Sequence, residues 1–348
     1  MDSMNRITKE EALLLLDEHD LIKLGKLATQ AKQRHHAQDK PVTFVIDRNI
    51  NYTNVCSCKC KFCAFYRESD HKESYVLDYS VIKQKTRELV DSGGTQLLLQ
   101  GGLNPDIKLE YYLSMVKNLR DDFPGLTIHA FSPPEIAYIA EQNSLSPEEL
   151  LEELIKAGLS SIPGGGAEIL SDSIRSKISP NKISSDKWLD IMRTAHNLGL
   201  KTTATMVFGL GESKEEIIEH LFKIRELQDE TGGFTAFIPW SFQPSNTELN
   251  LRKKSTAFDY LKIVAVSRIV LDNIKNIQAS WVTQGMAIAQ LSLSFGSNDF
   301  GGTMMEENVV RAAGVVNMTS TREIILTVKN AGFIPAQRDT AYNILKIH

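Results

Sequence analysis

Residues 54–66 read Asn-Val-Cys-Ser-Cys-Lys-Cys-Lys-Phe-Cys-Ala-Phe-Tyr, and they contain all four cysteines of this 348-residue chain. The four are Cys56, Cys58, Cys60 and Cys63. Disulfide bonds between residues so close in sequence would tie together no distant parts of the fold, so cross-linking is not their purpose. Thiolates packed this closely indicate a metal site. The chain is therefore expected to be organised around a metal-binding loop.

The spacing of three of these cysteines narrows the kind of metal site. Cys56, Cys60 and Cys63 follow the pattern C-x3-C-x2-C, and the aromatic Phe62 stands directly before the last of them. In this pattern the chain resembles the radical S-adenosylmethionine (SAM) enzymes. The resemblance implies a [4Fe–4S] cluster held by these three thiolates, with SAM bound to the iron that has no protein ligand. Such cofactors carry the difficult chemistry, and the protein holds and aims them.

Two other uses of the cysteines stay open at this stage. A structural zinc ion could take all four thiolates, Cys58 included, although such sites usually draw two pairs of cysteines from separate segments. A non-catalytic iron–sulfur electron carrier is the alternative from another functional class, but ferredoxin-like carriers are small and use four cysteines. Cys58 departs from the usual loop of the radical SAM family, and its role is open.

The composition excludes several other classes of protein. The net charge of −4 and the isoelectric point near 6.1 argue against nucleic-acid binding and against a polybasic membrane binder. We find no run of about 18 apolar residues and no signal-peptide pattern at the N-terminus. Because the thiols are available for a metal, the sequence predicts a cytoplasmic protein.

From residue 42 onward, short β-type runs alternate with amphipathic helical segments. This alternation is typical of a parallel sheet with helical connections. Eight such units over about 260 residues predict a (β/α)8 barrel of TIM type. We expect residues 1–41 to form an N-terminal helical extension, and residues 42–348 to form the barrel with a C-terminal capping segment. The predicted strands cover residues 42–46, 96–99, 126–130, 161–162, 202–207, 235–238, 277–281 and 291–295.

Glycine, proline and polar residues follow the predicted strands, at the end of the barrel where barrel enzymes have their active sites. The resemblance makes several of these residues candidates for binding SAM. Gly101 and Gly102 stand where the family has a Gly-Gly-Glu segment, although Leu103 takes the place of the acidic residue. For Glu168, a structural role near a helix N-terminus is an equally good interpretation. For the aromatic candidates, Phe62 and Tyr66, packing in the core is the alternative. The cofactor-binding candidates are Phe62, Tyr66, Gly101, Gly102, Ser132, Glu168 and Arg175.

Four further residues are candidates for catalysis or substrate binding. His129 ends an apolar strand and is a candidate for proton transfer, although a hydrogen-bonded core histidine is the commoner case. Asn298 and Asp299 lie in a polar cluster after the last predicted strand. The tail at residues 335–342 is expected to fold back over the rim, where Arg338 would meet a substrate carboxylate.

Longer segments narrow the resemblance to one branch of the family, which acts in futalosine-dependent menaquinone synthesis and in deazaflavin synthesis. That branch contains dehypoxanthine futalosine cyclases, aminofutalosine synthases and a deazaflavin synthase component that acts on tyrosine. Residues 201–206 and 227–240 resemble the cyclases most. The segments that carry the wider resemblance are residues 51–56, 100–105, 131–135, 163–170, 278–281, 298–303 and 337–340.

The resemblance to the cyclases implies both a reaction and its partners. A 5′-deoxyadenosyl radical would take hydrogen from C4′ of the ribose of dehypoxanthine futalosine, and the sugar carbon would add to the benzoate ring of the same molecule. Loss of one electron and one proton would then give cyclic dehypoxanthine futalosine. A low-potential electron donor such as flavodoxin or ferredoxin is the expected protein partner, and neither nucleic acid nor a membrane is expected.

Overall fold

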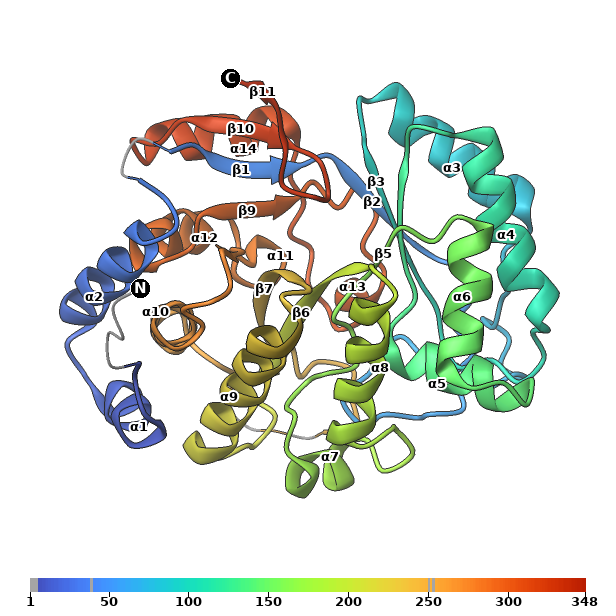
Figure 1. Ribbon diagram of the computed structural model, residues 1–348, viewed down its shortest axis with the longest axis horizontal. Helices are drawn as coiled ribbons and strands as arrows, with labels where there is room; N and C mark the ends of the chain where they lie inside the picture. Colours follow the sequence, from blue (N-terminus) through green and yellow to red (C-terminus); the bar gives the residue numbers. More distant parts are fainter. Residues whose placement is uncertain (1–5, 38–39, 250, 252–253) are drawn as a thin grey trace.

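A curled parallel sheet of seven strands forms the centre of the molecule (Figure 1). The computed structural model describes residues 6–37, 40–249, 251 and 254–348. Neighbouring strands are parallel throughout, in the order β2-β3-β4-β5-β6-β7-β8. These strands are β2 (Asp47–Asn51), β3 (Gln96–Gln100), β4 (Thr127–Ala130), β5 (Ser161–Ile162), β6 (Lys201–Phe208), β7 (Phe234–Ser241) and β8 (Asn276–Ile277).

Amphipathic helices connect these strands and cover the outer face of the sheet (Figure 1). In α6, for example, a capping box between Ser146 and Glu149 starts the helix, and Leu150, Leu151 and Leu154 turn one apolar face inward. The connecting helices are α3 (Tyr79–Asp91), α4 (Leu109–Asp122), α5 (Pro133–Gln142), α6 (Pro147–Ala157), α7 (Asp172–Ile178), α8 (Ser185–Asn197), α9 (Lys214–Thr231) and α10 (Ala257–Val270).

A second, four-stranded sheet completes the wall between β8 and β2. It has the order β11-β10-β1-β9, and β1 leads through Ile46 directly into β2. A parallel bridge joins Gln278, just after β8, to Asp299 in β9. The sheet therefore links the first and last strands of the barrel, and the predicted α/β barrel is confirmed. Its strands are β1 (Val42–Val45), β9 (Asp299–Gly302), β10 (Pro335–Arg338) and β11 (Ile344–Ile347).

The last predicted strand, residues 291–295, is wrong. Helix α12 (Met286–Ser292) runs into a 3₁₀ turn (Leu293–Phe295), which ends at Gly296 with a φ of 104°. The alternation Leu-Ser-Leu-Ser-Phe has the period of a strand, but a run this short does not distinguish a strand from a helix. The strand that completes the barrel is β9, whose two glycines hide it in the sequence.

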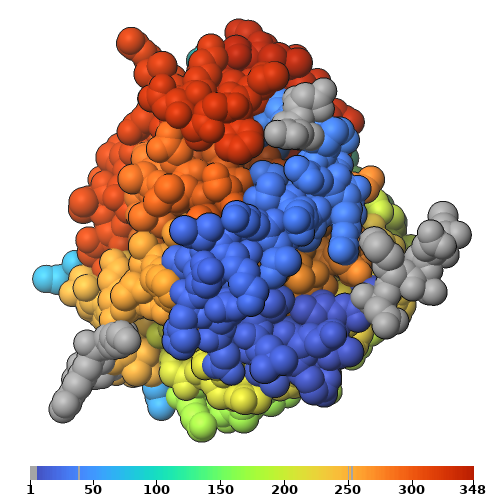
Figure 2. Space-filling view, turned by 90° about the vertical axis from the view of Figure 1, so that its left-hand side faces the viewer, coloured from blue at the N-terminus to red at the C-terminus, as the bar shows by residue number. Residues whose placement is uncertain are grey.

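The N-terminal helices α1 (Lys9–Asp17) and α2 (Leu21–Gln33) lie on the outside of the barrel. Leu24 and Ala28 of α2 form a buried cluster with Ala265 of α10. Figure 2 shows this blue segment lying across the orange part of the chain. The domain boundary at residue 41 stays a prediction, because these helices pack onto the barrel. The remaining helices are α11 (Trp281–Gln284), α13 (Val309–Ala312) and α14 (Thr321–Asn330).

Within the described residues, no helix has the length and the apolar character needed to cross a membrane.

Candidate active site

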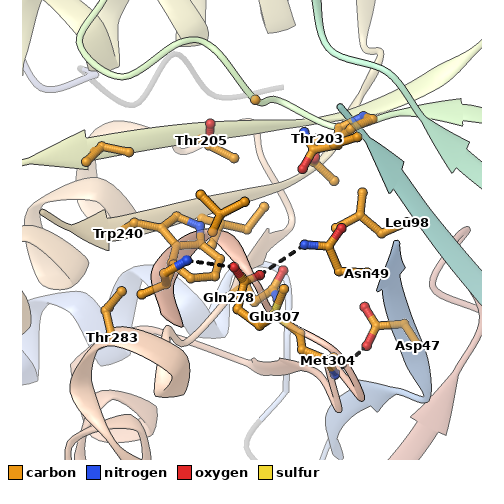
Figure 3. A pocket seen from close by; sticks show the side chains of 18 of the residues that line it. Asp47, Asn49, Leu98, Thr203, Thr205, Trp240, Gln278, Thr283, Met304 and Glu307 are labelled. Atoms are coloured by element: carbon orange, nitrogen blue, oxygen red, sulfur yellow. Dashed lines mark hydrogen bonds between the residues drawn. The ribbon is translucent and has the colours of Figure 1, made fainter. Parts of the chain in front are cut away.

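A cavity of about 360 Å³ occupies the interior of the barrel (Figure 3). Its lining residues alternate along the strands, because every second side chain of a strand points to the same face. In β3 they run from Gln96 at the first position to Gln100 at the last, and in β6 they are Thr203, Thr205 and Val207. The cavity therefore extends from the amino end of the strands to their carboxyl end.

The cysteine loop lies at the carboxyl end of this cavity. Cys63 and Phe62 line the cavity, whereas Cys58 and Cys60 are buried with their sulfur atoms 3.4 Å apart. No group of three Cys, His, Asp or Glu side chains in the described part of the chain is arranged to hold a single metal ion. The assignment of Cys56, Cys60 and Cys63 as the cluster ligands stays a prediction.

Gly101 and Gly102 lie directly behind the cysteine loop. A β-carbon on Gly102 would lie 2.1 Å from the carbonyl oxygen of Val55, and one on Gly101 would lie 2.4 Å from the ring of Tyr52. Only glycine allows this approach. The backbone N–H of Gly102 donates to the carbonyl of Thr53 (3.1 Å). Both glycines therefore support the loop from outside the cavity lining, and their contact with SAM stays a prediction.

Glu135 is a buried residue of this region that the sequence did not single out. Its carboxylate accepts hydrogen bonds from the Tyr52 hydroxyl (2.6 Å), the backbone N–H of Gly101 (2.9 Å) and the Ser132 hydroxyl (2.6 Å). Burial raises the pKa of Glu135 to about 7, against the effect of these donors. Ser132, a candidate for binding SAM, is thus engaged in holding the loop that carries Gly101. The Pro-Pro-Glu run that follows a predicted strand is the sequence feature that could have pointed to Glu135.

Glu168 lines the cavity and has one carboxylate oxygen without a hydrogen-bond partner among the described residues. Its Oε1 accepts from the Lys182 ammonium (2.9 Å), while its Oε2 is buried without a hydrogen-bond partner among the described residues. Glu168 has a φ of 40° and lies four residues before α7, so the alternative role at a helix N-terminus does not apply. An unpartnered buried carboxylate oxygen is costly unless a ligand uses it. The cavity mouth therefore fits a ligand with hydrogen-bond donors, such as SAM.

Arg175 and Lys182 hold Glu168 in place. The Arg175 guanidinium donates to the carbonyls of Ala167 (2.6 Å) and Ile183 (2.7 Å) and lies 3.8 Å from Glu168. It does not line the cavity, and its contact with SAM stays a prediction. The Lys182 ammonium lies 5.0 Å from the centroid of the Phe62 ring. Burial lowers the pKa of Lys182, but the charges of Cys60 and Glu168 outweigh it and raise the pKa. No local sequence pattern pointed to Lys182.

Tyr66, the second aromatic candidate, points away from the cavity. Its hydroxyl donates to the carboxylate of Glu248 (2.8 Å) near the surface. Phe62 alone of the two candidates contributes to the cavity wall. A contact between Tyr66 and the adenine of SAM stays a prediction.

The middle of the cavity is lined by polar side chains that were not among the candidate site residues (Figure 3). The Asn49 amide donates to the Glu307 carboxylate (3.0 Å), and Asp47 accepts from the backbone N–H of Met304 (2.7 Å). Burial raises the pKa of Glu307, and it raises that of Asp47 to about 6. Trp240 from β7 adds a large apolar surface beside them. This wall suits a ligand with both hydroxyl groups and an aromatic ring.

The C-terminal tail closes the amino end of the cavity, whereas the sequence placed it over the carboxyl rim. Thr340 donates to Gln96, the first residue of β3, at 2.9 Å. Arg338 forms a two-point ion pair with Asp299 (2.5 and 3.0 Å) and lines the cavity. The tail takes this position because β10 pairs in parallel with β1, which precedes the barrel strand β2.

The other substrate-binding candidates differ in their access to the cavity. His129 lines it, and its Nδ1 lies 2.8 Å from the Ser161 hydroxyl. Burial and the charge of Arg338 lower the pKa of His129 to about 3, so its ring is neutral near pH 7. Asn298 lies behind the wall, where it accepts from Arg268 (2.6 Å), and Asp299 acts through Arg338. We therefore expect positioning roles for Asn298 and Asp299.

Comparisons with known proteins agree with these features. Residues 50–224 match the family model of the Radical SAM superfamily, and residues 231–348 match that of the CofH/MqnC C-terminal region. The chain is 50% identical, over 98% of its length and 92% of the relative, to a protein of Halalkalibacterium halodurans named cyclic dehypoxanthine futalosine synthase. A protein of Streptomyces coelicolor with the same name is 44% identical over 99% of this chain and 86% of the relative.

Other relatives carry a different name. A protein of Archaeoglobus fulgidus, named 5-amino-6-(D-ribitylamino)uracil–L-tyrosine 4-hydroxyphenyl transferase, is 46% identical over 87% of this chain and 89% of its own length. Among solved structures, HydG, a maturase of the [FeFe]-hydrogenase, is 19% identical and superposes with a TM-score of 0.75 over 96% of this chain and 73% of its own. Methylornithine synthase (PylB), also 19% identical, superposes with a TM-score of 0.72 over 94% of this chain and 93% of its own. At this identity, both show the fold alone.

Proposed function

Because the chain belongs to the radical SAM superfamily, we propose that it converts dehypoxanthine futalosine into cyclic dehypoxanthine futalosine in menaquinone biosynthesis. The observation that carries this proposal is the 50% identity to a cyclic dehypoxanthine futalosine synthase over 98% of the chain, barrel and C-terminal region included. A cavity that runs through the whole barrel also supports an enzyme rather than an electron carrier. The resident cofactors are a [4Fe–4S] cluster and SAM.

The carboxyl end of the cavity is the place for these cofactors. Cys56, Cys60 and Cys63 would hold the cluster, and Glu168 would accept a hydrogen bond from SAM with Oε2, which has no hydrogen-bond partner among the described residues. When bound, the cofactors would supply the 5′-deoxyadenosyl radical that the removal of hydrogen from the ribose C4′ requires. Cys58 has no ligand role in this assignment.

The chain itself contributes enclosure and orientation. Both reacting ends belong to one substrate molecule, so the wall must fold that molecule with its ribose against its ring. Holding two groups in contact in this way is a large source of rate enhancement. Trp240 offers a surface for an aromatic ring, while Thr203, Thr205 and the Asn49–Glu307 pair offer partners for hydroxyl groups. The enclosed interior also keeps water away from reactive species.

Two further parts of the proposal concern the surroundings of the enzyme. A low-potential one-electron donor such as flavodoxin or ferredoxin would reduce the cluster, because SAM cleavage consumes an electron. We place the protein in the cytoplasm. The four cysteines are free thiols, which a reducing compartment preserves.

The experiment that tests the function is anaerobic turnover. The reduced protein is mixed with SAM and dehypoxanthine futalosine alone, and the products are read by mass spectrometry. We expect a product two hydrogens lighter than the substrate, together with 5′-deoxyadenosine. The same mixture without reductant should leave the substrate intact.

The second candidate function follows from the relative of Archaeoglobus fulgidus, which is 46% identical over 87% of the chain. That function would use L-tyrosine and 5-amino-6-(D-ribitylamino)uracil. Consumption of these two compounds, with dehypoxanthine futalosine left unchanged, would replace our proposal by this one.

A further inference from the structure

The amino end of the cavity is built from residues of the C-terminal tail. Arg338 ends β10, and Thr340 and Tyr342 follow in the turn that leads to β11; all three line the cavity. Asp339 holds this turn, because its carboxylate accepts from the backbone and side-chain N–H groups of Asn343 (both 2.8 Å). The end opposite to the cysteine loop is thus a defined surface with its own polar groups.

Arg338 lines the cavity and keeps hydrogen-bonding capacity. A guanidinium has five N–H donors. Nε and one N–H of Nη2 bind Asp299 (2.5 and 3.0 Å), and one N–H of Nη1 binds the Asp339 carbonyl (3.0 Å). Two N–H groups, one on each terminal nitrogen, have no partner among the described residues. These terminal nitrogens form the fork that binds a carboxylate at two points.

Tyr342 adds a second donor beside this fork. Its ring lies 3.8 Å from the Arg338 guanidinium carbon, and its hydroxyl is buried without a hydrogen-bond partner among the described residues. The backbone of Tyr342 has a φ of 67°, which is uncommon for a bulky residue. A buried hydroxyl without a partner is unfavourable, so a ligand that accepts from it would be favoured.

Arg338 supplies the positive charge of this region. Arg338 is the only Arg or Lys among the described residues that line the cavity. A second buried guanidinium, Arg268, bonds to carbonyls and to Asn298 behind the same wall, and none of the described ion pairs includes it. Asp299 is the carboxylate paired with Arg338. Asp47 also lines the cavity, but burial raises its pKa to about 6 and so reduces its negative charge near that pH.

We propose that Arg338 and Tyr342 form a carboxylate-binding subsite at the closed amino end of the cavity, which receives the carboxylate of the substrate and so fixes its direction. This inference rests on the proposed function, in which the substrate carries a benzoate carboxylate. With the carboxylate at the amino end, the ribose points along the cavity toward Cys63 and Glu168. The ribose C4′ then faces the end at which SAM is bound.

The test compares Tyr342→Phe with the wild-type enzyme that carries its cluster and SAM, without reductant, so that binding occurs without turnover. Calorimetry measures the affinity for dehypoxanthine futalosine and for its carboxamide analogue. We expect the carboxylate to bind about ten-fold more weakly to Tyr342→Phe, because a hydrogen bond to a charged group is lost. The carboxamide should bind the wild type weakly, and its affinity should change less in the variant.

Two controls separate binding from folding. The removed hydroxyl has no hydrogen-bond partner among the described residues, so the midpoint of thermal unfolding of Tyr342→Phe should not fall. Tyr79→Phe is the matched control, because the Tyr79 hydroxyl bonds to Asp122 outside the barrel. Its substrate affinity should equal that of the wild type. Arg338→Lys keeps the charge but loses the fork, and it should bind the carboxylate more weakly than Tyr342→Phe does.

The outcomes distinguish this subsite from the proposed function. Equal affinity of wild type and Tyr342→Phe for the carboxylate, or equal affinity of the wild type for carboxylate and carboxamide, would overturn the subsite. If the wild type does not bind dehypoxanthine futalosine, the proposed function fails, and L-tyrosine is compared with L-tyrosinamide instead. A preference for tyrosine that Tyr342→Phe reduces would retain the subsite. If the wild type shows no preference for L-tyrosine over L-tyrosinamide, the subsite is excluded.

Discussion

Single residues in the cavity show where a ligand is needed. The structure leaves the Glu168 Oε2, the Asn49 Oδ1 and the Tyr342 hydroxyl buried without partners among the described residues, and all three residues line the cavity. Most buried polar groups in folded proteins are paired, so unpaired ones that share a cavity indicate binding positions. One lies near the cysteine loop, one in the middle and one at the amino end. A ligand set that spans the barrel would satisfy all three.

Glu168→Gln tests the position near the cysteines. We expect SAM to bind at least about ten-fold more weakly, because a charge-assisted hydrogen bond becomes a neutral one. The iron content should not change, since Glu168 is not a cluster ligand. SAM affinity is measured by calorimetry and iron by colorimetric assay. Glu153→Gln on the exposed face of α6 is the control, and unchanged SAM affinity in Glu168→Gln would leave that residue a purely structural role as the partner of Lys182.

At the level of elements, the cysteine loop depends on contacts from several directions. The Gly101–Gly102 turn packs against the start of the cysteine loop. The backbone N–H of Lys61 donates to the carbonyl of Ile178 in α7 (2.9 Å). The side chain of Asn181 reaches the carbonyl of Cys58 (3.4 Å). These contacts hold the backbone of a loop that has no regular secondary structure. The loop can therefore present its thiols before the cluster is bound.

Replacing the cysteines one at a time tests the ligand assignment. Cys56→Ala, Cys60→Ala and Cys63→Ala should each abolish the brown colour of anaerobically purified protein and its content of about four iron and four sulfide per chain. Cys58→Ala should keep both. The sulfur of Cys58 lies 3.4 Å from that of Cys60, too close for two ligands of different irons without rearrangement of the loop. Loss of the cluster in Cys58→Ala would show that our choice of ligands is wrong.

At the level of the whole molecule, a single cavity connects the cofactor end with the tail. β9 and β1 close the wall between β8 and β2, and the turn after β10 closes the amino end. In the proposed cyclisation, both reacting groups of the one substrate must meet within this cavity of about 360 Å³.

A labelled substrate tests this idea and separates the cyclase from the aminofutalosine synthase of the same branch. That synthase adds its radical to an enolpyruvyl double bond, so it needs a second, small substrate. With dehypoxanthine futalosine deuterated at the ribose C4′, we expect deuterium in 5′-deoxyadenosine, read by mass spectrometry. Consumption of the enolpyruvyl benzoate precursor, with the labelled substrate left intact, would identify the protein as the synthase.

The sequence predicted the parallel sheet well because its signals are local. Strands such as β3 and β6 are short apolar runs followed by glycine or polar residues, and amphipathic helices stand between them. The local pattern gave a wrong prediction at residues 291–295, where a helical turn has the apolar–polar alternation of a strand. It also missed the strand β9, because two glycines interrupt its pattern. In both cases packing against neighbouring elements overrode the local pattern.

The sequence by itself determined the metal-binding loop and the barrel, since the spacing of Cys56, Cys60 and Cys63 and the period of the apolar residues lie within short segments. Tertiary structure alone decided which distant residues share the cavity. Lys182 meets Glu168, Glu307 meets Asn49, and Arg338 reaches the amino end instead of the carboxyl rim. These contacts depend on the order in which strands pair, above all on β10 beside β1. Strand pairing between distant segments is set by the packing of the whole chain, which no local spacing records.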